Sequence, residues 1–510
     1  MSLCAVNRRF FCRPGVVAGC RLALIACLVS LAAGCPRPEG RDEPGDKTLA
    51  AANVHLRLLV VGDPALASAI EQLQGEWTAQ TGSTFHVAQA TQLDLAAGSP
   101  PEADVVVTAS HQLPELATRS WILPAPAALA LQHAETGPGS AGTKPSQGGW
   151  ADVFPLLRAR EAVWGDATMA VPFGSPVLTL YYRADLLEKL GARPPRTWAE
   201  YQKLAESLAD RKRLGPSAPA SGTPWFGALE PLSPGWAGIM LLARAAPYAS
   251  HRANYSTLFQ IDTMEPLIHG PPFVRALEEL MAAARLNPPE QFRCDPAAIR
   301  RAFWAGQCAM AVTWPTAADK SPPEVSSAIR LGLAELPGAT EVYNVSPQTW
   351  ETRLSGEDPS VPLLSVAGRL GTVTTRCPSP ETAFRLLLWL SGPQWNRQVS
   401  AASPETTLFR QSDIRFAQSW TERPVPPATA GEYAVLTQRI LSRSQWAFAL
   451  RIPGRGEYLA ALDEAVGQAL RGQQPPQEAL RQTSVRWRAI TNRLGLDRQR
   501  AAYHASLGLE

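Results

Sequence analysis

The segment from Val171 to Asp210 constrains the fold more than any other part of this chain of 510 residues. Its sequence is VPFGSPVLTLYYRADLLEKLGARPPRTWAEYQKLAESLAD, which predicts two strands, a helix, a turn at two prolines and a second helix. The second predicted strand, around Val177 to Tyr181, is too apolar to leave one face in water. Such runs are typical of strands covered by helices on both sides. The segment therefore predicts an α/β sheet.

The ends of the two predicted helices are marked by residues with known backbone effects. Pro194 and Pro195 stop the first helix, because proline cannot donate a backbone hydrogen bond. Thr197 and Glu200 have the spacing of a capping box, in which each side chain accepts a hydrogen bond from the other residue's amide. The second helix is therefore expected to begin directly after Thr197.

The first 34 residues have the pattern of an export signal. Four arginines are followed by an apolar run from Leu22 to Gly34, which is shorter than the roughly 20 residues that span a bilayer. The residues LAAGC that end at Cys35 resemble a bacterial lipobox, although Ala32 stands where leucine is more common. This resemblance implies that Cys35 becomes a lipidated N-terminus that anchors the protein to a membrane. An ordinary secretory signal is the alternative.

Charge and spacing exclude several classes of function. The formal charge is +3, and the signal contains four arginines and no acid, so the remainder carries 3 − 4 = −1. It holds no basic block or basic helix stripe, which excludes a nucleic-acid partner. No CxxC or HxxxH spacing occurs, so we predict no metal site and no cofactor.

Two cysteines outside the signal, Cys294 and Cys308, leave a question open. Export to an oxidising compartment favours a disulfide between them. A helix predicted between them would instead hold them about 15 Å apart, which is too far for a bond. A disulfide and a pair of free thiols therefore both remain open.

Several passages in order resemble one protein family. Besides Val171 to Asp210 they include WILP at 121–124, FWAGQCAMAVTWP at 303–315, LPG at 336–338 and GQQPPQEAL at 472–480. They resemble extracellular solute-binding proteins of bacterial ABC importers, in the carbohydrate-binding group that includes maltose-binding protein. The resemblance covers roughly residues 54 to 497. It implies a two-lobed α/β clamp of the type II periplasmic-binding-protein class, in which each lobe is a mixed sheet flanked by helices and a hinge joins the lobes.

The resemblance also implies a division of the chain. A signal at 1–34 and a flexible tether at 35–53 precede the clamp, and a tail at 499–510 follows it. Lobe 1 is expected at 54–168 and 366–428, and lobe 2 at 169–365 and 429–498.

Sugars present an apolar ring face and many hydroxyl groups, so their sites combine aromatic rings with carboxylates and other hydrogen-bonding groups. In a clamp these groups lie on loops after strand ends. The resemblance carries this role over, position by position, to Asp63, Ser110, His111, Ser175, Glu230, Trp236, Trp314 and Tyr458. Structural roles stay open for them, such as an N-cap for Asp63 and core packing for Trp236.

The function implied by the resemblance is capture rather than catalysis. We expect a monomeric, lipid-anchored protein that faces the periplasm or the cell exterior. It would bind a sugar, oligosaccharide, polyol or similar polar solute and deliver it to ABC permease subunits. One alternative is a sensor or structural lipoprotein with the same clamp. Another is a glycan-active enzyme with Asp63 and Glu230 as paired acids, although no nucleophile or metal-protease motif supports chemistry.

Overall fold

The computed structural model describes residues 53–126, 149–215, 222–287, 289–319 and 329–509. The predicted signal, Cys35 and almost all of the tether lie outside these residues. Within the described ranges, no helix combines the length and the apolar character that a membrane span requires.

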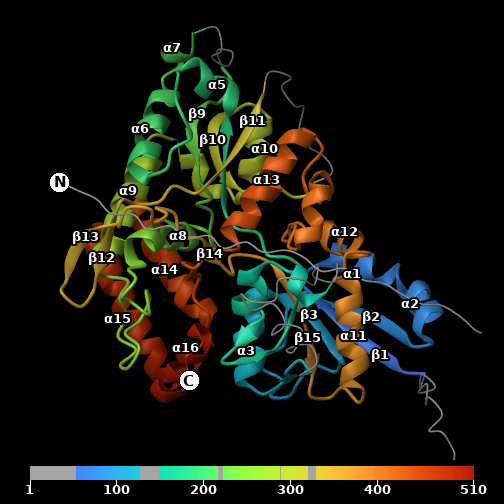
Figure 1. The fold of residues 1–510 in the computed structure, drawn as a ribbon. Helices are drawn as coiled ribbons and strands as arrows, with labels where there is room; N and C mark the ends of the chain where they lie inside the picture. The colour runs from blue at the N-terminus through green and yellow to red at the C-terminus, as the bar shows by residue number, and fades with distance from the viewer. Residues whose placement is uncertain (1–52, 127–148, 216–221, 288, 320–328, 510) are drawn as a thin grey trace, which may run out of the picture. The chain divides into compact units, whose positions relative to one another are not determined.

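The first of two main sheets has six strands, in the order β2-β1-β3-β15-β4 with β7 beside β15. β1 is parallel to β2 and β3, whereas β15 is antiparallel to β3, β4 and β7. Val105 and Val107 face the apolar cluster beneath α1, α2 and α11, and Val106 faces the opposite cluster beneath α3. Helices therefore cover both faces (Figure 1). The elements are β1 (His55–Val61), α1 (Pro64–Glu71), α2 (Gln74–Thr81), β2 (Thr84–Ala90), β3 (Val105–Ala109), η1 (Ser110–Gln112), α3 (Leu113–Thr118), β4 (Ile122–Leu123), β7 (Val171–Pro172), β15 (Arg369–Thr374) and α11 (Pro380–Leu390).

The second main sheet has four strands in the order β11-β8-β10-β9. β8 is antiparallel to both of its neighbours, and β10 is parallel to β9. All six residues of β10 are buried, which confirms the strand predicted at CAMAVTW. The strands and their nearby helices are β8 (Thr179–Arg183), α5 (Ala184–Lys189), α6 (Trp198–Ala209), α7 (Arg211–Leu214), β9 (Phe226–Leu229), α10 (Pro296–Trp304), β10 (Cys308–Thr313), β11 (Leu331–Glu335) and α13 (Pro427–Ile440).

The segment from Val171 to Asp210 has the predicted order of elements. It contains β7, β8, α5 and α6, and four of the five residues of β8 are buried. Both hydrogen bonds of the capping box are present, from the Glu200 amide to Thr197 and from the Thr197 amide to Glu200. Local sequence therefore fixed this part of the fold.

The chain passes between the two sheets at least twice. It leaves the first sheet after Pro172 and enters the second at Thr179, and it returns between Leu364 and Arg369. The short strand β14 (Leu363–Leu364), which precedes the return, pairs with β16 (Ala447–Phe448). These passages lie close to the predicted lobe boundaries at 168/169 and 365/366.

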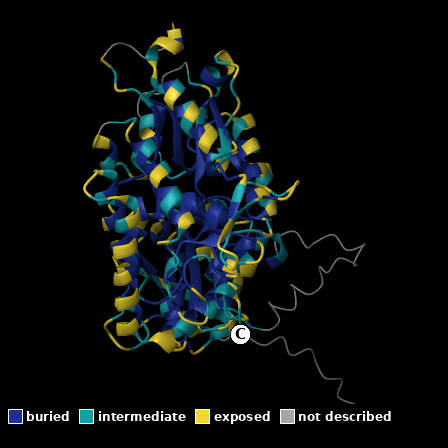
Figure 2. Ribbon diagram, turned by 90° about the vertical axis from the view of Figure 1, so that its left-hand side faces the viewer, coloured by how far each residue is buried: buried dark blue, intermediate teal, exposed yellow. Residues whose placement is uncertain are grey.

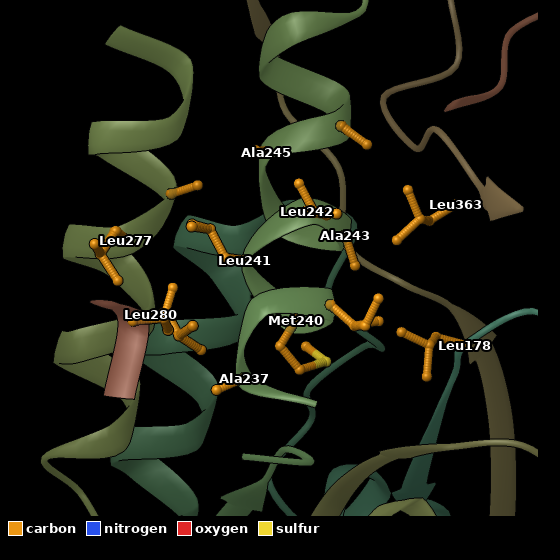
Figure 3. Close-up of a cluster of buried hydrophobic side chains, with 14 of the residues drawn as sticks. Leu178, Ala237, Met240, Leu241, Leu242, Ala243, Ala245, Leu277, Leu280 and Leu363 are labelled. Carbon is orange, nitrogen blue, oxygen red and sulfur yellow. The ribbon is translucent and has the colours of Figure 1, made fainter. Parts of the chain in front are cut away.

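A large apolar cluster holds the second part of the chain together. The helix α8 (Ala237–Ala249) lies at its centre, with all thirteen residues buried. Figure 3 shows Leu241 of α8 facing Leu277 and Leu280 of α9 (Pro271–Ala284), while Leu178 and Leu363 lie on the other side of the helix. Both segments that join the sheets therefore pack against the same core.

The outer helices are amphipathic, with buried inner faces and exposed outer faces (Figure 2). They are α14 (Arg455–Leu470), α15 (Pro476–Leu494) and α16 (Leu496–Leu507). The structure differs here from the predicted tail at 499–510, because α16 is helical and buries Ala502 and Tyr503. The remaining elements are η2 (Trp150–Asp152), the π-helical turn η3 (Leu157–Glu161), β5 (Val163–Trp164), β6 (Ala167–Thr168), η5 (Pro289–Arg293), β12 (Glu341–Asn344), β13 (Thr349–Thr352), α12 (Asn396–Val399), η6 (Ser400–Ala402) and η7 (Gln411–Trp420).

Candidate functional site

Asp63 lies between the end of β1 and the start of α1, and its two carboxylate oxygens accept hydrogen bonds from different groups. Oδ1 caps α1 by accepting a hydrogen bond from the Leu66 amide at 3.0 Å. Oδ2 accepts from Arg369 Nε at 2.9 Å and from Ser403 Oγ at 2.5 Å. The side chain is buried. The cap and the candidate site therefore share one residue.

Arg369, the first residue of β15, connects Asp63 to a second acid. Its Nη1 donates to Glu405 at 2.7 Å, and its Nη2 donates to the carbonyl oxygen of Gly62 at 3.3 Å. Arg369 is buried, whereas the side chain of Glu405 is 44% exposed. Neither Arg369 nor Glu405 was predicted, because each is far from Asp63 in the sequence.

Ser110 and His111 follow β3 and lie on the same edge of the first sheet. The Ser110 amide and hydroxyl donate to the carbonyl oxygens of Gly368 at 3.0 Å and Ala367 at 3.1 Å, so this side chain holds the return segment. The Nδ1 atom of His111 is buried, and no described residue forms a hydrogen bond with it. Burial lowers the pKa of His111 well below its usual value, and the positive charges of Arg455 and Arg369 lower it further.

Ser175 lies where the two segments that join the sheets touch. A Cβ at Gly368, which has φ of +120°, would lie 2.0 Å from Ser175 Oγ, so only glycine fits there. Beside it, the buried Glu161 accepts a hydrogen bond from Ser365 Oγ at 3.0 Å. Burial raises the pKa of Glu161, while the hydroxyls of Ser175 and Ser110 and the charge of Arg451 oppose the rise.

Trp314 and Trp236 form the aromatic part of the candidate site. Their ring centroids are 5.7 Å apart with planes inclined by 42°. Trp314 directly follows β10, and its Nε1 donates to the carbonyl oxygen of Pro404 at 3.1 Å. Pro404 lies between Ser403 and Glu405, so a loop of three residues contacts Trp314 on one side and the Asp63–Arg369 pair on the other.

The other two predicted residues are hydrogen-bonded to partners outside this group. Glu230 forms a buried ion pair with Arg244 of α8, whose guanidinium lies 4.0 Å from the centroid of the Trp198 ring. Tyr458 is fully buried, its hydroxyl lies 2.8 Å from Thr491 Oγ1, and its ring packs against neighbouring aromatic side chains. Every polar atom of these two side chains is engaged by a protein group.

The structure shows no disulfide between Cys294 and Cys308. Cys294 and Cys308 are both free thiols, and Cys308 is fully buried in β10. Burial raises the pKa of both thiols. In the described part of the chain, no group of three or more histidine, cysteine, aspartate or glutamate side chains is arranged to hold a metal ion.

Comparison with known proteins places this geometry in a family. The family model for bacterial extracellular solute-binding proteins matches residues 71–413. The search of curated proteins found no match.

Solved structures share the fold at low sequence identity. The sugar-binding protein MalE of Xanthomonas citri is 17% identical, with 88% of this chain and 100% of that chain covered and a TM-score of 0.62. A solute-binding protein of Agrobacterium radiobacter K84 in complex with ribitol is also 17% identical, covering 86% and 99% with a TM-score of 0.60. The maltose-bound MalE3 of T. maritima is 16% identical, covering 86% and 100% with a TM-score of 0.59. The fold is the two-lobed fold of these binding proteins, and the chain belongs to the family of bacterial extracellular solute-binding proteins.

Proposed function

We propose that the protein captures a sugar, oligosaccharide or polyol between its two lobes and delivers it to the permease of an ABC transporter. The observation that carries the proposal is the loop from Ser403 to Glu405. It contacts the Asp63–Arg369 pair through its two end residues and Trp314 through Pro404. Polar groups of one lobe and Trp314 of the other therefore contact the same short stretch of chain.

The chemistry of these groups suits a hydroxylated ligand. Glu405 and Arg369 offer an acceptor and a donor for directed hydrogen bonds to hydroxyl groups. Trp236, which is half-buried beside the buried ring of Trp314, offers an apolar surface for a sugar ring or the carbon chain of a polyol. Related structures hold ribitol, mannitol and maltose as bound ligands, which supports this class of solute.

A binding role also fits the state of the two acids that could serve a glycosidase. Both oxygens of Glu230 accept hydrogen bonds from Arg244, at 3.1 and 2.5 Å. Both oxygens of Asp63 are likewise engaged by protein donors. Neither carboxylate is free to attack a substrate or to exchange a proton with it. We therefore propose that the protein is not an enzyme.

We extend the proposal to the location of the protein. The lipobox-like sequence that ends at Cys35 suggests a lipid anchor on a bacterial membrane, reached after removal of the signal at 1–34. The anchored protein acts as a monomer beside its permease. Mass spectrometry of the N-terminal peptide tests the anchor, because a diacylated Cys35 has a mass that an unmodified terminus cannot have.

Binding and closure are tested together. Calorimetry of the purified protein with ribitol, mannitol and maltose should show saturable binding by at least one of them. Solution scattering should then show a smaller radius of gyration at saturating ligand, because a ligand that contacts both lobes favours the closed state. Unchanged dimensions at saturation would argue against closure, and release of glucose from maltose would argue against a role limited to binding.

A further inference from the structure

Ser365, the first residue after β14, has a backbone conformation that residues other than glycine rarely adopt. Its φ is +58°, and the residue is buried. A left-handed backbone at such a residue is costly and persists only where neighbouring groups enforce it. Strain of this kind is concentrated at functional sites and switch regions. The groups that hold Ser365 therefore bear on function.

The return passage from Leu364 to Arg369 is anchored on both sides of Ser365. Its first residue belongs to β14, which pairs with β16. At the other end, the hydroxyl and the amide of Ser110 hold the last two carbonyl groups before β15. Ser365 and Val366 lie between these two anchors. Because hinges absorb a change of backbone angles at a few residues, we expect a rotation of one sheet against the other to be absorbed there.

Glu161, the last residue of η3, is the group that holds the side chain of Ser365. Its Oε1 accepts a hydrogen bond from Ser365 Oγ at 3.0 Å, and Glu161 is fully buried. No described residue forms a hydrogen bond with its Oε2. The free energy of a hydrogen bond to a carboxylate is of the same order as the cost of a left-handed serine. This one contact is therefore large enough to decide whether the strained conformation is populated.

The hydrogen bond between Glu161 and Ser365 joins the two parts of the clamp. η3 is fixed beside the first sheet, because the carbonyl oxygen of the next residue, Ala162, accepts from the amides of Met169 and Ala170 at 2.9 and 3.2 Å, directly before β7. β14 and β16 instead each contribute a residue to the apolar cluster around α8. A change in this hydrogen bond therefore acts where one part of the chain meets the other.

A second strained residue lies at the same junction. Leu450, two residues after β16, is buried and has φ of +29°. The next residue, Arg451, donates to three backbone carbonyl groups between Arg160 and Val163, at 2.7, 2.6 and 2.9 Å. Both strands of the β14–β16 pair thus lead into a left-handed residue, and both of these segments are hydrogen-bonded to η3. Two strained positions at one junction favour a conformational role.

We infer that Ser365 is a pivot of the clamp and that Glu161 is the positioning residue that holds this pivot in the conformation described above. The inference rests on the proposed capture function. In this conformation the loop from Ser403 to Glu405 contacts groups of both lobes, which is the arrangement that capture requires. The hydrogen bond between Glu161 and Ser365 therefore sets the fraction of the protein that is ready to bind. The apparent Kd varies inversely with that fraction.

The test measures the dimensions and the affinity of the purified full-length protein, with ribitol, mannitol and maltose as probes. Ser365→Ala removes the hydrogen bond and keeps the strained backbone. The ligand-free variant should therefore have a larger radius of gyration, and it should bind roughly tenfold more weakly, the lower end of the effect of a hydrogen bond to a charged group. Ser365→Gly removes the same bond but adopts φ of +58° without strain, so it should lose less affinity. Ser120→Ala is the matched control, because Ser120 has φ of +54° but is exposed, and it should change neither quantity.

A double-mutant cycle tests whether the two side chains act through one hydrogen bond. Glu161→Gln should weaken binding in the same direction, and Ser365→Ala should cost much less affinity in the Glu161→Gln protein than in the wild type. Melting curves show whether each variant is folded.

Three results would overturn the pivot inference and leave the capture function standing. They are wild-type affinity and dimensions in folded Ser365→Ala, an equal loss in Ser120→Ala, and equal effects of Ser365→Ala in both backgrounds. A loss of stability without a change in affinity or dimensions belongs to the first of these, because it marks a purely structural role. Absence of saturable binding of all three probes to the wild type would overturn the capture function. The ligand-free radius of gyration of the variants would then still decide whether Ser365 is a pivot.

Discussion

The Glu230–Arg244 pair provides the sharpest test of whether a predicted ligand residue is structural. The two side chains are 4% and 1% exposed, and Arg244 has no other hydrogen-bond acceptor among the described residues. Glu230→Gln therefore leaves a buried guanidinium, stacked on Trp198, without its counter-charge. Breaking a buried pair from one side costs about 3–5 kcal/mol, against a total stability of roughly 5–15 kcal/mol.

Urea unfolding followed by tryptophan fluorescence measures this cost. The midpoint should fall sharply with little change in slope. The double variant Glu230→Leu/Arg244→Met should regain much of the loss, because it removes both buried charges. Glu188→Gln, which breaks the exposed pair with Arg330, is the control and should unfold close to the wild type. A Glu230→Gln variant as stable as this control, but with weakened ligand binding, would refute the structural reading.

Three further predictions concern the aromatic pair, pH and the segments that join the sheets. Trp314→Ala should weaken ligand binding by about 1–3 kcal/mol and Trp314→Phe by less. Calorimetry measures the affinity, and melting curves show whether each variant is folded. Unchanged affinity in a folded variant would remove Trp314 from the site. Burial raises the pKa of Asp413 to about 6. Its protonated form is favoured in the folded state, so the free energy of unfolding should fall by roughly 3 kcal/mol as pH rises from about 4 to about 6. Asp413→Asn should flatten that part of the plot of unfolding free energy against pH. Parallel plots for the variant and the wild type would contradict the assignment. Gly174→Ala places a Cβ 2.5 Å from the carbonyl oxygen of Thr407 at φ of +108°, whereas Gly191→Ala at φ of +61° meets open space. By chemical unfolding the first should lose at least about 1 kcal/mol more than the second, and equal losses would exclude the steric clash.

The sequence was most informative where short-range chemistry decides the structure. The capping box at Thr197 and Glu200 and the buried run of β10 are present as predicted, because caps and strand faces depend on residues only a few positions apart. Asp63 shows the same locality, since it caps α1 as its position before Pro64 indicated. These features hold whatever ligand the clamp takes.

Partners far apart in the sequence could not be predicted in this way. Asp63 is paired with Arg369, which lies on a strand that joins the first sheet only after the chain returns from the second. No local pattern links two such positions. Glu115 and Gly454 are a similar case, because their hydrogen bond forms only where α3 and the start of α14 come together.

Two predicted ligand residues carried signals that favoured the core. Arg244 is the only charged residue in the apolar helix sequence AGIMLLARAAPYA, and a lone charge on such a helix needs a buried partner, here Glu230. Tyr458 shares its helical spacing with the buried Ala461, Leu462 and Ala465, which is the pattern of an inward face. The sequence analysis instead assigned Glu230 and Tyr458 to the ligand site because they match positions that bind ligand in the family.

The two arginine–carboxylate systems differ in a way that bears on function. Arg244 and Glu230 are both buried, so no solute can replace one of them without opening the core. Arg369 has one buried carboxylate partner, Asp63, and one that is 44% exposed, Glu405. If the solute binds here as proposed, we expect one of its oxygens to replace Glu405 on Arg369 while Asp63 keeps the cation paired. The exposure of Glu405 is thus what separates the second system, which we propose as a ligand contact, from the fully buried first one.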